Sequence, residues 1–352
     1  AFVPICTFGV ANTDNRRMQV AEHPYTTLTP DRVLDALSDL GLWPDGRLLA
    51  LSSYENRVYR AHLDEPVPGT DPTVRTVVVK FYRPGRWTTA QIQEEHDFAA
   101  ELVDAEVPAV APLVLHGATL HQSGGFDLAV SPLRGGRAPE LDDLDVLEWI
   151  GRFLARLHNV GAERPFEHRP ALDVAAFAQE PAQWLLTHQA IPLEVEGEWR
   201  AAFDAALPLL QSTLQGLPER AIRLHGDCHP GNILWTPDEG PHFVDLDDAR
   251  MGPAVQDLWM LISGDRRQRT LQLSALLDGY EQLRDFDRRE LGWIEGLRTL
   301  RLIHYSAWLA RRWHDPIFPI NFPWFGTPDY WRGQVQMLHE QIEAMEEEPL
   351  VV

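Results

Sequence analysis

The pattern of hydrophobic and polar positions changes character partway along the chain. In the first third, short apolar or alternating runs predict β-strands at about 47–51, 57–63, 74–82 and 126–131. Two other segments there predict helices: about 30–40 follows a Thr29-Pro30 start signal and ends before Gly41, and about 88–105 carries apolar residues every three to four positions. We therefore expect the chain to begin with a β-sheet accompanied by one or two helices.

Beyond a Pro/Gly cluster at 132–136, the pattern becomes mostly helical. Amphipathic periodicity predicts helices at about 143–159, 197–213, 253–263, 267–283, 287–313 and 329–346. The only strand-like material in this part is 233–235 and 242–246, which we interpret as one small hairpin. The sequence thus predicts an α+β chain whose second part is helical apart from this hairpin.

The change in pattern predicts four segments of unequal size. A small β-rich lobe is expected at 24–132 and a helical lobe at 133–346. A natural start at Met18 would make 1–23 an extension, which we expect to be poorly ordered, and 347–352 a tail. The boundary between the lobes is placed at the Pro/Gly cluster because such residues interrupt both helices and strands.

Charge and composition exclude several classes of protein. The 352 residues include 31 Lys and Arg against 52 Asp and Glu, a net charge of −21, which argues against nucleic acid or an anionic membrane as a partner. No stretch approaches the roughly 18 apolar residues of a membrane span. The two cysteines, Cys6 and Cys228, could form at most one disulfide, which excludes a disulfide-rich secreted domain. The first residues lack the basic region of a signal peptide. We expect a cytoplasmic protein, working as a monomer.

The sharpest local signal is the segment 225–232, which reads His-Gly-Asp-Cys-His-Pro-Gly-Asn. Asp227 and Asn232 lie five residues apart on it, and Asp245 lies at the end of the second strand of the predicted hairpin. This is the kinase order His-x-Asp-x4-Asn followed by a metal-binding Asp. Asp227 alone would be read as an ordinary loop-capping carboxylate. Together, the three predict a catalytic base, Asp227, and two Mg²⁺ ligands, Asn232 and Asp245, with Asp245 also counted as catalytic.

A lysine with a carboxylate partner is the second element that phosphoryl transfer requires. Lys80 ends a Val-rich run, where an exposed edge charge is the simpler alternative. Both Glu94 and Glu95 of the following helix compete as its partner. Glu95 lies on the inward face with Ile92, whereas helix geometry turns Glu94 about 100° away. We therefore expect Glu95 to pair with Lys80, the alternative being two solvated acids in the first turns.

These motifs resemble the stress response kinase A family, which is related to the aminoglycoside phosphotransferases. The resemblance is carried by segments 53–59, 79–84, 223–235, 243–250, 252–261 and 307–324, and it spans about residues 24–345. It implies a bilobal, protein-kinase-like fold with an antiparallel sheet in the small lobe. It also implies ATP- and Mg²⁺-dependent phosphorylation of Ser/Thr hydroxyls of protein substrates, autophosphorylation included, in a bacterial stress response. Lys80 would then be the phosphate-binding lysine.

The sequence lacks the glycine-rich loop that covers the phosphates in many kinases. The corresponding turn is 52–56, where the resemblance implies that Ser53 offers its hydroxyl and backbone N–H to a phosphate. An ordinary hairpin serine is the alternative. Adenine would bind backbone groups at about 130–133. Ser53 and the backbone at 130–133 would thus bind ATP without taking part in the transfer step itself.

Several neighbouring residues are interpreted as support. We expect His225 to brace the catalytic loop, and Asp257 to cap a helix and hold that loop by hydrogen bonds. Of Asp247 and Asp248, one is expected to face solvent and the other to bond to backbone. The Trp/Arg-rich stretch 307–324 fits either a substrate groove or core packing, and we favour core packing.

The acceptor is less determined than the reaction. Only residues 246–256 separate Asp245 from Asp257, and no Ala-Pro-Glu triplet follows, so we expect no activation-loop control. A short segment is also typical of small-molecule kinases of the aminoglycoside, choline or homoserine type, which remain the alternative to a protein kinase. A metal-dependent hydrolase would leave Lys80 and Asn232 without a role. A pseudokinase is disfavoured because the motif residues are intact.

Overall fold

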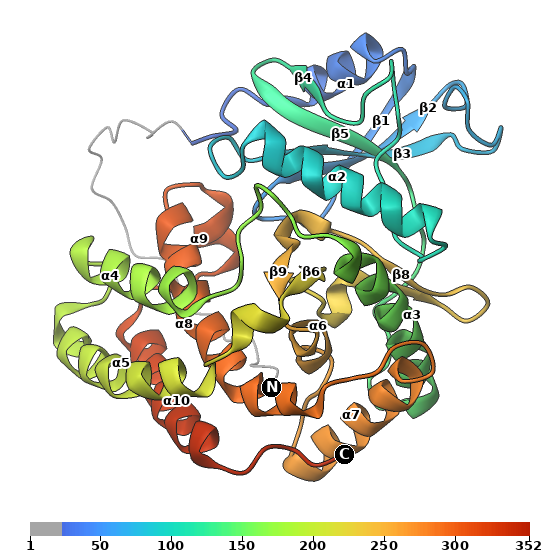
Figure 1. The fold of residues 1–352 in the computed structure, drawn as a ribbon. Helices are drawn as coiled ribbons and strands as arrows, with labels where there is room; N and C mark the ends of the chain where they lie inside the picture. Colours follow the sequence, from blue (N-terminus) through green and yellow to red (C-terminus); the bar gives the residue numbers. More distant parts are fainter. Residues whose placement is uncertain (1–22) are drawn as a thin grey trace, which may run out of the picture.

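The Val-rich run at the centre of the small lobe forms the middle strand of its sheet. A computed structural model of the chain describes residues 23–352 (Figure 1). Five antiparallel strands are arranged in the order β1-β2-β3-β5-β4, which confirms the predicted antiparallel sheet. Their bounds are Pro44–Ala50 (β1), Arg57–Leu63 (β2), Thr76–Phe81 (β3), His121–Ser123 (β4) and Phe126–Pro132 (β5). The three-residue strand β4 was not predicted, because it is too short to show alternation.

Two helices accompany this sheet, as the sequence predicts. Helix α1 (Pro30–Asp39) starts after Thr29, whose side chain accepts a hydrogen bond from the backbone N–H of Arg32. Helix α2 (Thr89–Asp104) starts with a capping box between Thr88 and Gln91. Helix α2 lies between the sheet and the large lobe (Figure 1). Its residues therefore face both parts of the molecule.

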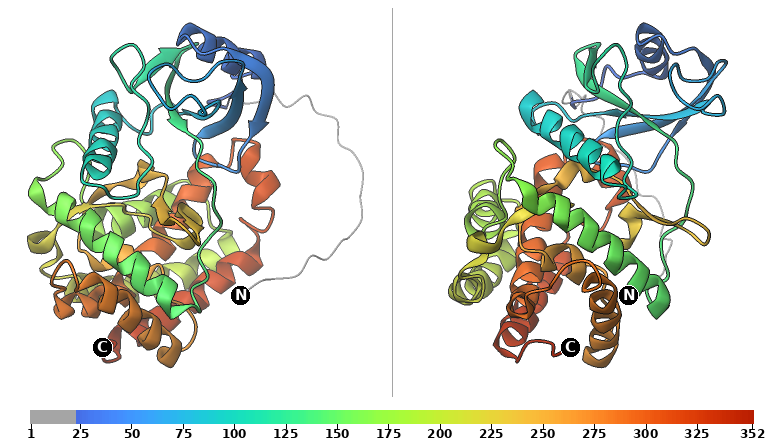
Figure 2. Two further views of the ribbon diagram at one scale, coloured as in Figure 1. Left: turned by 90° about the vertical axis from the view of Figure 1, so that its right-hand side faces the viewer. Right: turned by 45° about the vertical axis from the view of Figure 1, so that its right-hand side comes forward.

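The large lobe is built around a close pair of helices. Helix α3 (Leu144–Glu163) packs along α7 (Arg266–Tyr280), and Figure 2 shows both on one side of the lobe. A Cβ at Gly151 would collide with the backbone of Leu276, and one at Gly279 would collide with the backbone of Glu148. The two glycines therefore permit a helix contact that no larger residue allows.

The remaining helices agree with the periodicity except where they are short. The helix expected at 253–263 is shorter, and the one expected at 287–313 is a 3₁₀ turn, Arg288–Trp293, followed by α8. Helices α4 and α9, each of which contains a proline, were not predicted. The bounds are Glu180–Thr187 (α4), Leu193–Thr213 (α5), Val255–Trp259 (α6), Ile294–Arg312 (α8), Ile317–Asn321 (α9) and Pro328–Glu346 (α10).

Two small sheets lie inside the large lobe. The predicted hairpin is present as β7 (Ile233–Thr236) and β8 (Gly240–Phe243), but its second strand ends before the predicted 246, so Asp245 lies beyond it. The expectation that it would be the only strand material was wrong, because β6 (Ile222–Leu224) pairs with β9 (Arg250–Gly252). These three-residue strands find partners far along the chain, so local sequence gives no signal for them. Between them, the two sheets hold the segments on which the motif residues lie.

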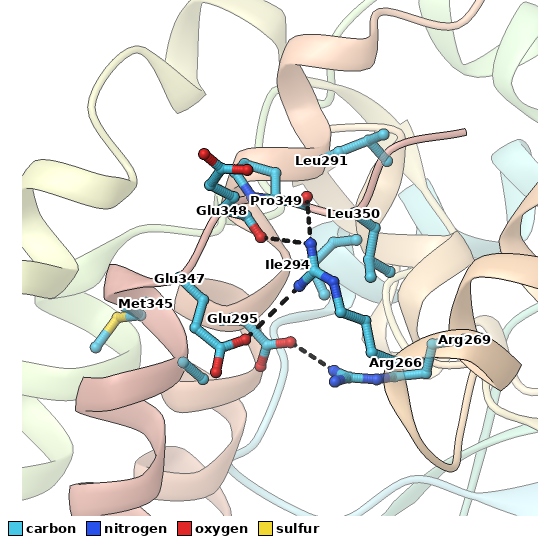
Figure 3. Close-up of a pocket in the computed structure, with 12 residues that line it drawn as sticks. Arg266, Arg269, Leu291, Ile294, Glu295, Met345, Glu347, Glu348, Pro349 and Leu350 are labelled. Carbon is cyan, nitrogen blue, oxygen red and sulfur yellow. Dashed lines mark hydrogen bonds and ion pairs between the residues drawn. The ribbon is translucent and has the colours of Figure 1, made fainter.

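The C-terminal residues are fastened to the large lobe. The Arg266 side chain, at the start of α7, donates hydrogen bonds to the backbone oxygens of Glu348 and Pro349, both at 2.8 Å. Figure 3 shows these bonds around a pocket between this segment, α7 and α8. None of the motif residues lines this pocket.

Among the described residues, no helix is long and apolar enough to cross a membrane. The expected N-terminal extension lies, up to residue 22, outside the described residues.

Candidate active site

A buried carboxylate fixes the shape of the loop at 225–232. Asp257, at the start of α6, is fully buried and accepts the backbone N–H groups of His225 and Gly226, each at 2.9 Å. His158 Nε2 lies 3.1 Å from the same carboxylate. Burial alone would raise the pKa of Asp257, but the hydrogen bond and charge of His158 and the backbone N–H groups hold it below its usual value. Asp257 therefore holds the loop, as expected for a supporting residue.

The same loop is bound to the segment that carries Asp245. His225 Nε2 donates to the backbone oxygen of Val244 at 2.9 Å. Gly226 has a φ of +84°, and a Cβ there would collide with the backbone oxygen of Asp248. Only glycine fits both the conformation and the close approach. The loop and the segment after β8 are thus held as one unit.

Asp227 lies on this loop with about a fifth of its side chain exposed. The Asn232 side-chain amide donates to the backbone oxygen of Asp227 at 2.9 Å, which holds the two predicted residues together. Arg301, from α8, places Nη1 2.5 Å from Asp227 Oδ1. Sequence reasoning missed Arg301, which is 74 residues away and belongs to no motif. A cation therefore contacts the predicted base.

Asp245 follows β8 in the left-handed conformation, with φ of 60°, which few residues other than glycine adopt. Its side chain is 52% exposed, and its Oδ1 lies 3.2 Å from Lys80 Nζ. The backbone N–H of Val244 donates to the backbone oxygen of Asn232 at 3.0 Å across the hairpin. The hairpin thereby brings the backbone of Asn232 beside that of Asp245.

Lys80 is surrounded by carboxylates. Its Nζ lies 3.3 Å from Glu95 Oε1, 3.2 Å from Asp245 Oδ1 and 3.0 Å from Asp247 Oδ1. Burial would lower the pKa of Lys80, but Asp247, Glu95 and Asp245 outweigh it and raise that pKa well above its ordinary value. The lysine is therefore charged, and three acids share it.

The two acids after Asp245 differ from our expectation. Asp247 is 3% exposed and forms ion pairs with Lys80 and Arg86. Burial opposes its ionisation, but Arg86 and Lys80 lower its pKa to about 2. Asp248 lies 2.8 Å from Arg86 Nη2 and 2.6 Å from Arg250 Nη2. The prediction of one solvent-facing and one backbone-bonded acid was wrong, because Arg86, from a distant segment, pairs with both acids and the nearby Arg250 also pairs with Asp248.

Helix α2 presents the adjacent Glu94 and Glu95 to different partners. Glu95 faces Lys80, and its other oxygen lies 3.0 Å from Arg169 Nη2. Glu94 accepts the backbone N–H groups of residues 167–169 at 2.6 to 3.0 Å. Arg169, which is buried, also donates to the backbone oxygens of Asp247 and Ala249. Glu95 is thus the glutamate beside Lys80, and α2 is bonded to the large lobe.

Ser53 lies in the turn between β1 and β2. Its hydroxyl donates to the backbone oxygen of Asn56 at 3.2 Å. Asn56 is buried and accepts the backbone N–H of Arg83 at 3.0 Å. Among the described residues, the Ser53 side chain makes no hydrogen bond to Lys80 or Asp245. Its contact with a phosphate therefore stays a prediction.

The oxygen ligands in this site are few. Within residues 23–352, no group of three or more His, Cys, Asp or Glu side chains is arranged to hold a metal ion. Asn232 and Asp245 offer one amide and one carboxylate oxygen. Magnesium is commonly bound by one or two carboxylates together with substrate phosphates and water. The residues present therefore fit Mg²⁺ that arrives with a nucleotide.

Solved structures share this architecture. An amicoumacin kinase superposes with a TM-score of 0.67 at 18% identity, over 91% of this chain and 95% of that one. A microcompartment-associated aminopropanol kinase gives 0.66 at 18% identity, over 89% and 98%. Spectinomycin phosphotransferase gives 0.63 at 13% identity, over 88% and 98%. At these identities the comparison establishes the bilobal kinase-like fold and nothing finer.

Sequence comparison identifies nearer relatives. "Serine/threonine protein kinase RdoA" of Salmonella typhimurium is 46% identical over 326 residues, which cover 93% of this chain and 96% of that protein. "Stress response kinase A" of Escherichia coli is 45% identical over the same shares. The profile of the phosphotransferase enzyme family matches residues 47–294. The chain therefore belongs to the phosphotransferase enzyme family and, within it, to the stress response kinase A family.

Proposed function

We propose that the protein transfers the γ-phosphoryl group of ATP to Ser/Thr hydroxyls of proteins, its own included, with Mg²⁺ and as part of a stress response. One observation carries this proposal: Lys80, paired with Glu95, lies 3.2 Å from Asp245. The hairpin and loop then connect Asp245 to Asn232 and Asp227. These are the groups that phosphoryl transfer requires. A relative named as a serine/threonine protein kinase supports the protein acceptor.

Each residue has a proposed part in the reaction. Lys80 would hold the phosphates, and Ser53 would contact them from the turn at 52–56. Asn232 and Asp245 would bind Mg²⁺, which when bound neutralises charge on the phosphates. Asp227 accepts the proton of the acceptor hydroxyl as its oxygen attacks phosphorus, while the bond to ADP breaks. Adenine would bind backbone at about 130–133.

A small-molecule acceptor is the second candidate. The amicoumacin, aminopropanol and spectinomycin enzymes of similar fold are named for small substrates. Residues 246–256 also leave little room for a peptide-binding activation segment. For either acceptor, the net charge of −21 supports partners other than nucleic acid and membrane. We further propose a cytoplasmic monomer.

The test is transfer of labelled phosphate. The protein is incubated with γ-labelled ATP and Mg²⁺, alone, with a protein extract, and with a panel of small alcohols and amino alcohols. We expect label on serine or threonine, lost with a chelator and reduced at least about 1,000-fold in Asp227→Asn, which removes the base while keeping its shape.

The other outcomes are equally informative. Label confined to a small alcohol would replace the protein acceptor by the second candidate. If Asp227→Asn transfers phosphate as fast as the unaltered protein, the kinase proposal is wrong.

A further inference from the structure

The Trp/Arg-rich stretch at 307–324 has a role that neither of its sequence interpretations describes. At the end of α8, Trp308 Nε1 donates to Glu55 Oε2 at 2.5 Å, and Arg312 Nε lies 2.9 and 2.7 Å from the two Glu55 oxygens. Glu55 belongs to the turn 52–56 of the small lobe. Side chains of the large lobe therefore bind this turn directly.

A second carboxylate lies in the large lobe and is contacted by arginines of the small lobe. Asp315, between α8 and α9, is fully buried in the large lobe. Arg57 Nη2 donates to both of its oxygens at 2.8 Å, and Arg83 Nη2 donates to one at 2.7 Å. Both arginines come from the small lobe, at the start of β2 and just after β3. Arg83 also places Nε 2.8 Å from Glu55 Oε1, so it joins the two carboxylates.

Burial makes these contacts matter more than ordinary surface ion pairs. Glu55 has 12% of its side chain exposed and Asp315 has 1%. A carboxylate removed from water is costly unless cations and hydrogen bonds compensate it, and removing one partner is strongly destabilising. The compensation here crosses between the lobes. Separating the lobes would therefore leave Asp315 without both arginines, and it would leave Glu55 without Trp308 and Arg312.

The cluster continues into the proposed active site. Arg86 Nη1 lies 3.7 Å from Glu55 Oε2 and also forms an ion pair with Asp247. Asp247 in turn lies 3.0 Å from Lys80 Nζ. A displacement of Glu55 would thus disturb a cation that contacts an acid of the lysine cluster.

We propose that Glu55, Asp315 and their partners Arg57, Arg83, Trp308 and Arg312 form an interlobe clamp that positions the turn 52–56 for nucleotide phosphates. Glycine-rich kinases shape the corresponding turn with backbone alone. This chain instead fixes its turn by side-chain ion pairs to the other lobe. The clamp residues act through the turn and are positioning residues. The proposal rests on the proposed function for the identity of the ligand, but not for the contacts themselves.

The first test measures the turn without nucleotide. Hydrogen–deuterium exchange of peptides covering 52–57 is compared among the unaltered protein, Glu55→Gln and Arg312→Gln. Because each variant removes charge-assisted hydrogen bonds that hold this turn, we expect exchange in the turn to accelerate about tenfold or more. Peptides covering 225–232, which Asp257 holds, should keep their exchange rates.

A neighbouring arginine of α8 and its partner in α4 supply the control. Arg311 Nη2 lies 2.6 Å from Glu180 Oε1, and this pair stays within the large lobe. Glu180→Gln should leave exchange at 52–57 unchanged. Arg312→Lys, which keeps a cation near Glu55, should restore part of the protection. Trp308→Phe keeps the aromatic ring but removes the N–H donor, and it serves if a charge variant fails to fold.

The second test measures phosphoryl transfer. In Glu55→Gln and Trp308→Phe we expect the KM for ATP to rise about tenfold, more than kcat falls, because the turn contacts the nucleotide and not the acceptor. Unchanged exchange at 52–57 and unchanged KM in an active protein would overturn the clamp and leave the proposed function intact. A protein without any transfer activity would refute the proposed function, while the exchange result would still decide whether the clamp holds the turn.

Discussion

At the scale of the residue, the contact between Arg301 and Asp227 is the feature that most affects the proposed chemistry. The loop at 225–232 contains no lysine or arginine, so the cation beside its aspartate comes from α8. The guanidinium holds Oδ1 of Asp227, while Oδ2 lies 3.5 Å from Asn232 Nδ2 and 3.6 Å from His229 Nε2. In the proposed reaction, the guanidinium would also place positive charge near the phosphoryl group that is transferred.

We predict that Arg301→Gln lowers kcat for phosphoryl transfer by about tenfold to a hundredfold, because one charge-assisted contact of roughly 1.5–3 kcal/mol is lost. Arg301→Lys should recover part of the rate. Arg298→Gln, one turn earlier on α8, is the matched control, since Arg298 pairs with Glu295 instead. Steady-state kinetics check this, and an unchanged kcat in Arg301→Gln would show that the contact is incidental.

At the scale of the element, the close approach of α3 and α7 depends on glycine. We predict that Gly279→Ala lowers the free energy of unfolding by about 2 kcal/mol or more, because the added Cβ collides with the backbone of Glu148, which cannot move aside as a side chain would. Gly197→Ala, in α5, is the matched control because its Cβ meets nothing within 4 Å. It should be neutral or stabilising by up to about 1 kcal/mol. Urea denaturation of both variants measures this, and equal stabilities would contradict the account of this helix pair.

At the scale of the whole molecule, the burial of a histidine makes the free energy of unfolding depend on pH. His96 is 1% exposed, lies 2.7 Å from the Tyr82 hydroxyl and 2.9 Å from that of Thr119, and burial together with Lys80 and Arg169 lowers its pKa to about 3. An unfolded histidine titrates near 6.5. Its contribution is therefore fully present above about pH 6.5 and is lost as pH falls toward the folded pKa, since only the unfolded chain takes up the proton.

We predict that this residue alone reduces the free energy of unfolding by about 2 kcal/mol between pH 7 and pH 5. His96→Gln, which cannot be protonated, should show a correspondingly shallower decline over that range. Denaturant titrations at several pH values compare the two proteins and cancel the contributions of all other groups. Parallel pH profiles would mean that His96 is not held neutral in the folded protein.

The sequence alone determined the parts whose signals are local. Alternation and helical periodicity predicted the sheet and the long helices, because a buried face repeats every two or 3.6 residues. The spacing of Asp227, Asn232 and Asp245 indicated a kinase because one loop and one hairpin carry all three. Helix geometry singled out Glu95 over Glu94, since adjacent residues point about 100° apart.

Only the tertiary structure decided which distant charges meet. The ion pairs of Asp247 with Lys80, of Asp227 with Arg301, and of Asp315 with Arg57 join segments far apart along the chain. No periodicity or spacing encodes such contacts, because each depends on how complete elements pack. For the same reason the pairing of β6 with β9 was missed. The sequence therefore shows which charged side chains are candidates for a functional role. Only the fold shows which partner each of them has, and so whether it lies on the surface, supports the structure or belongs to the site.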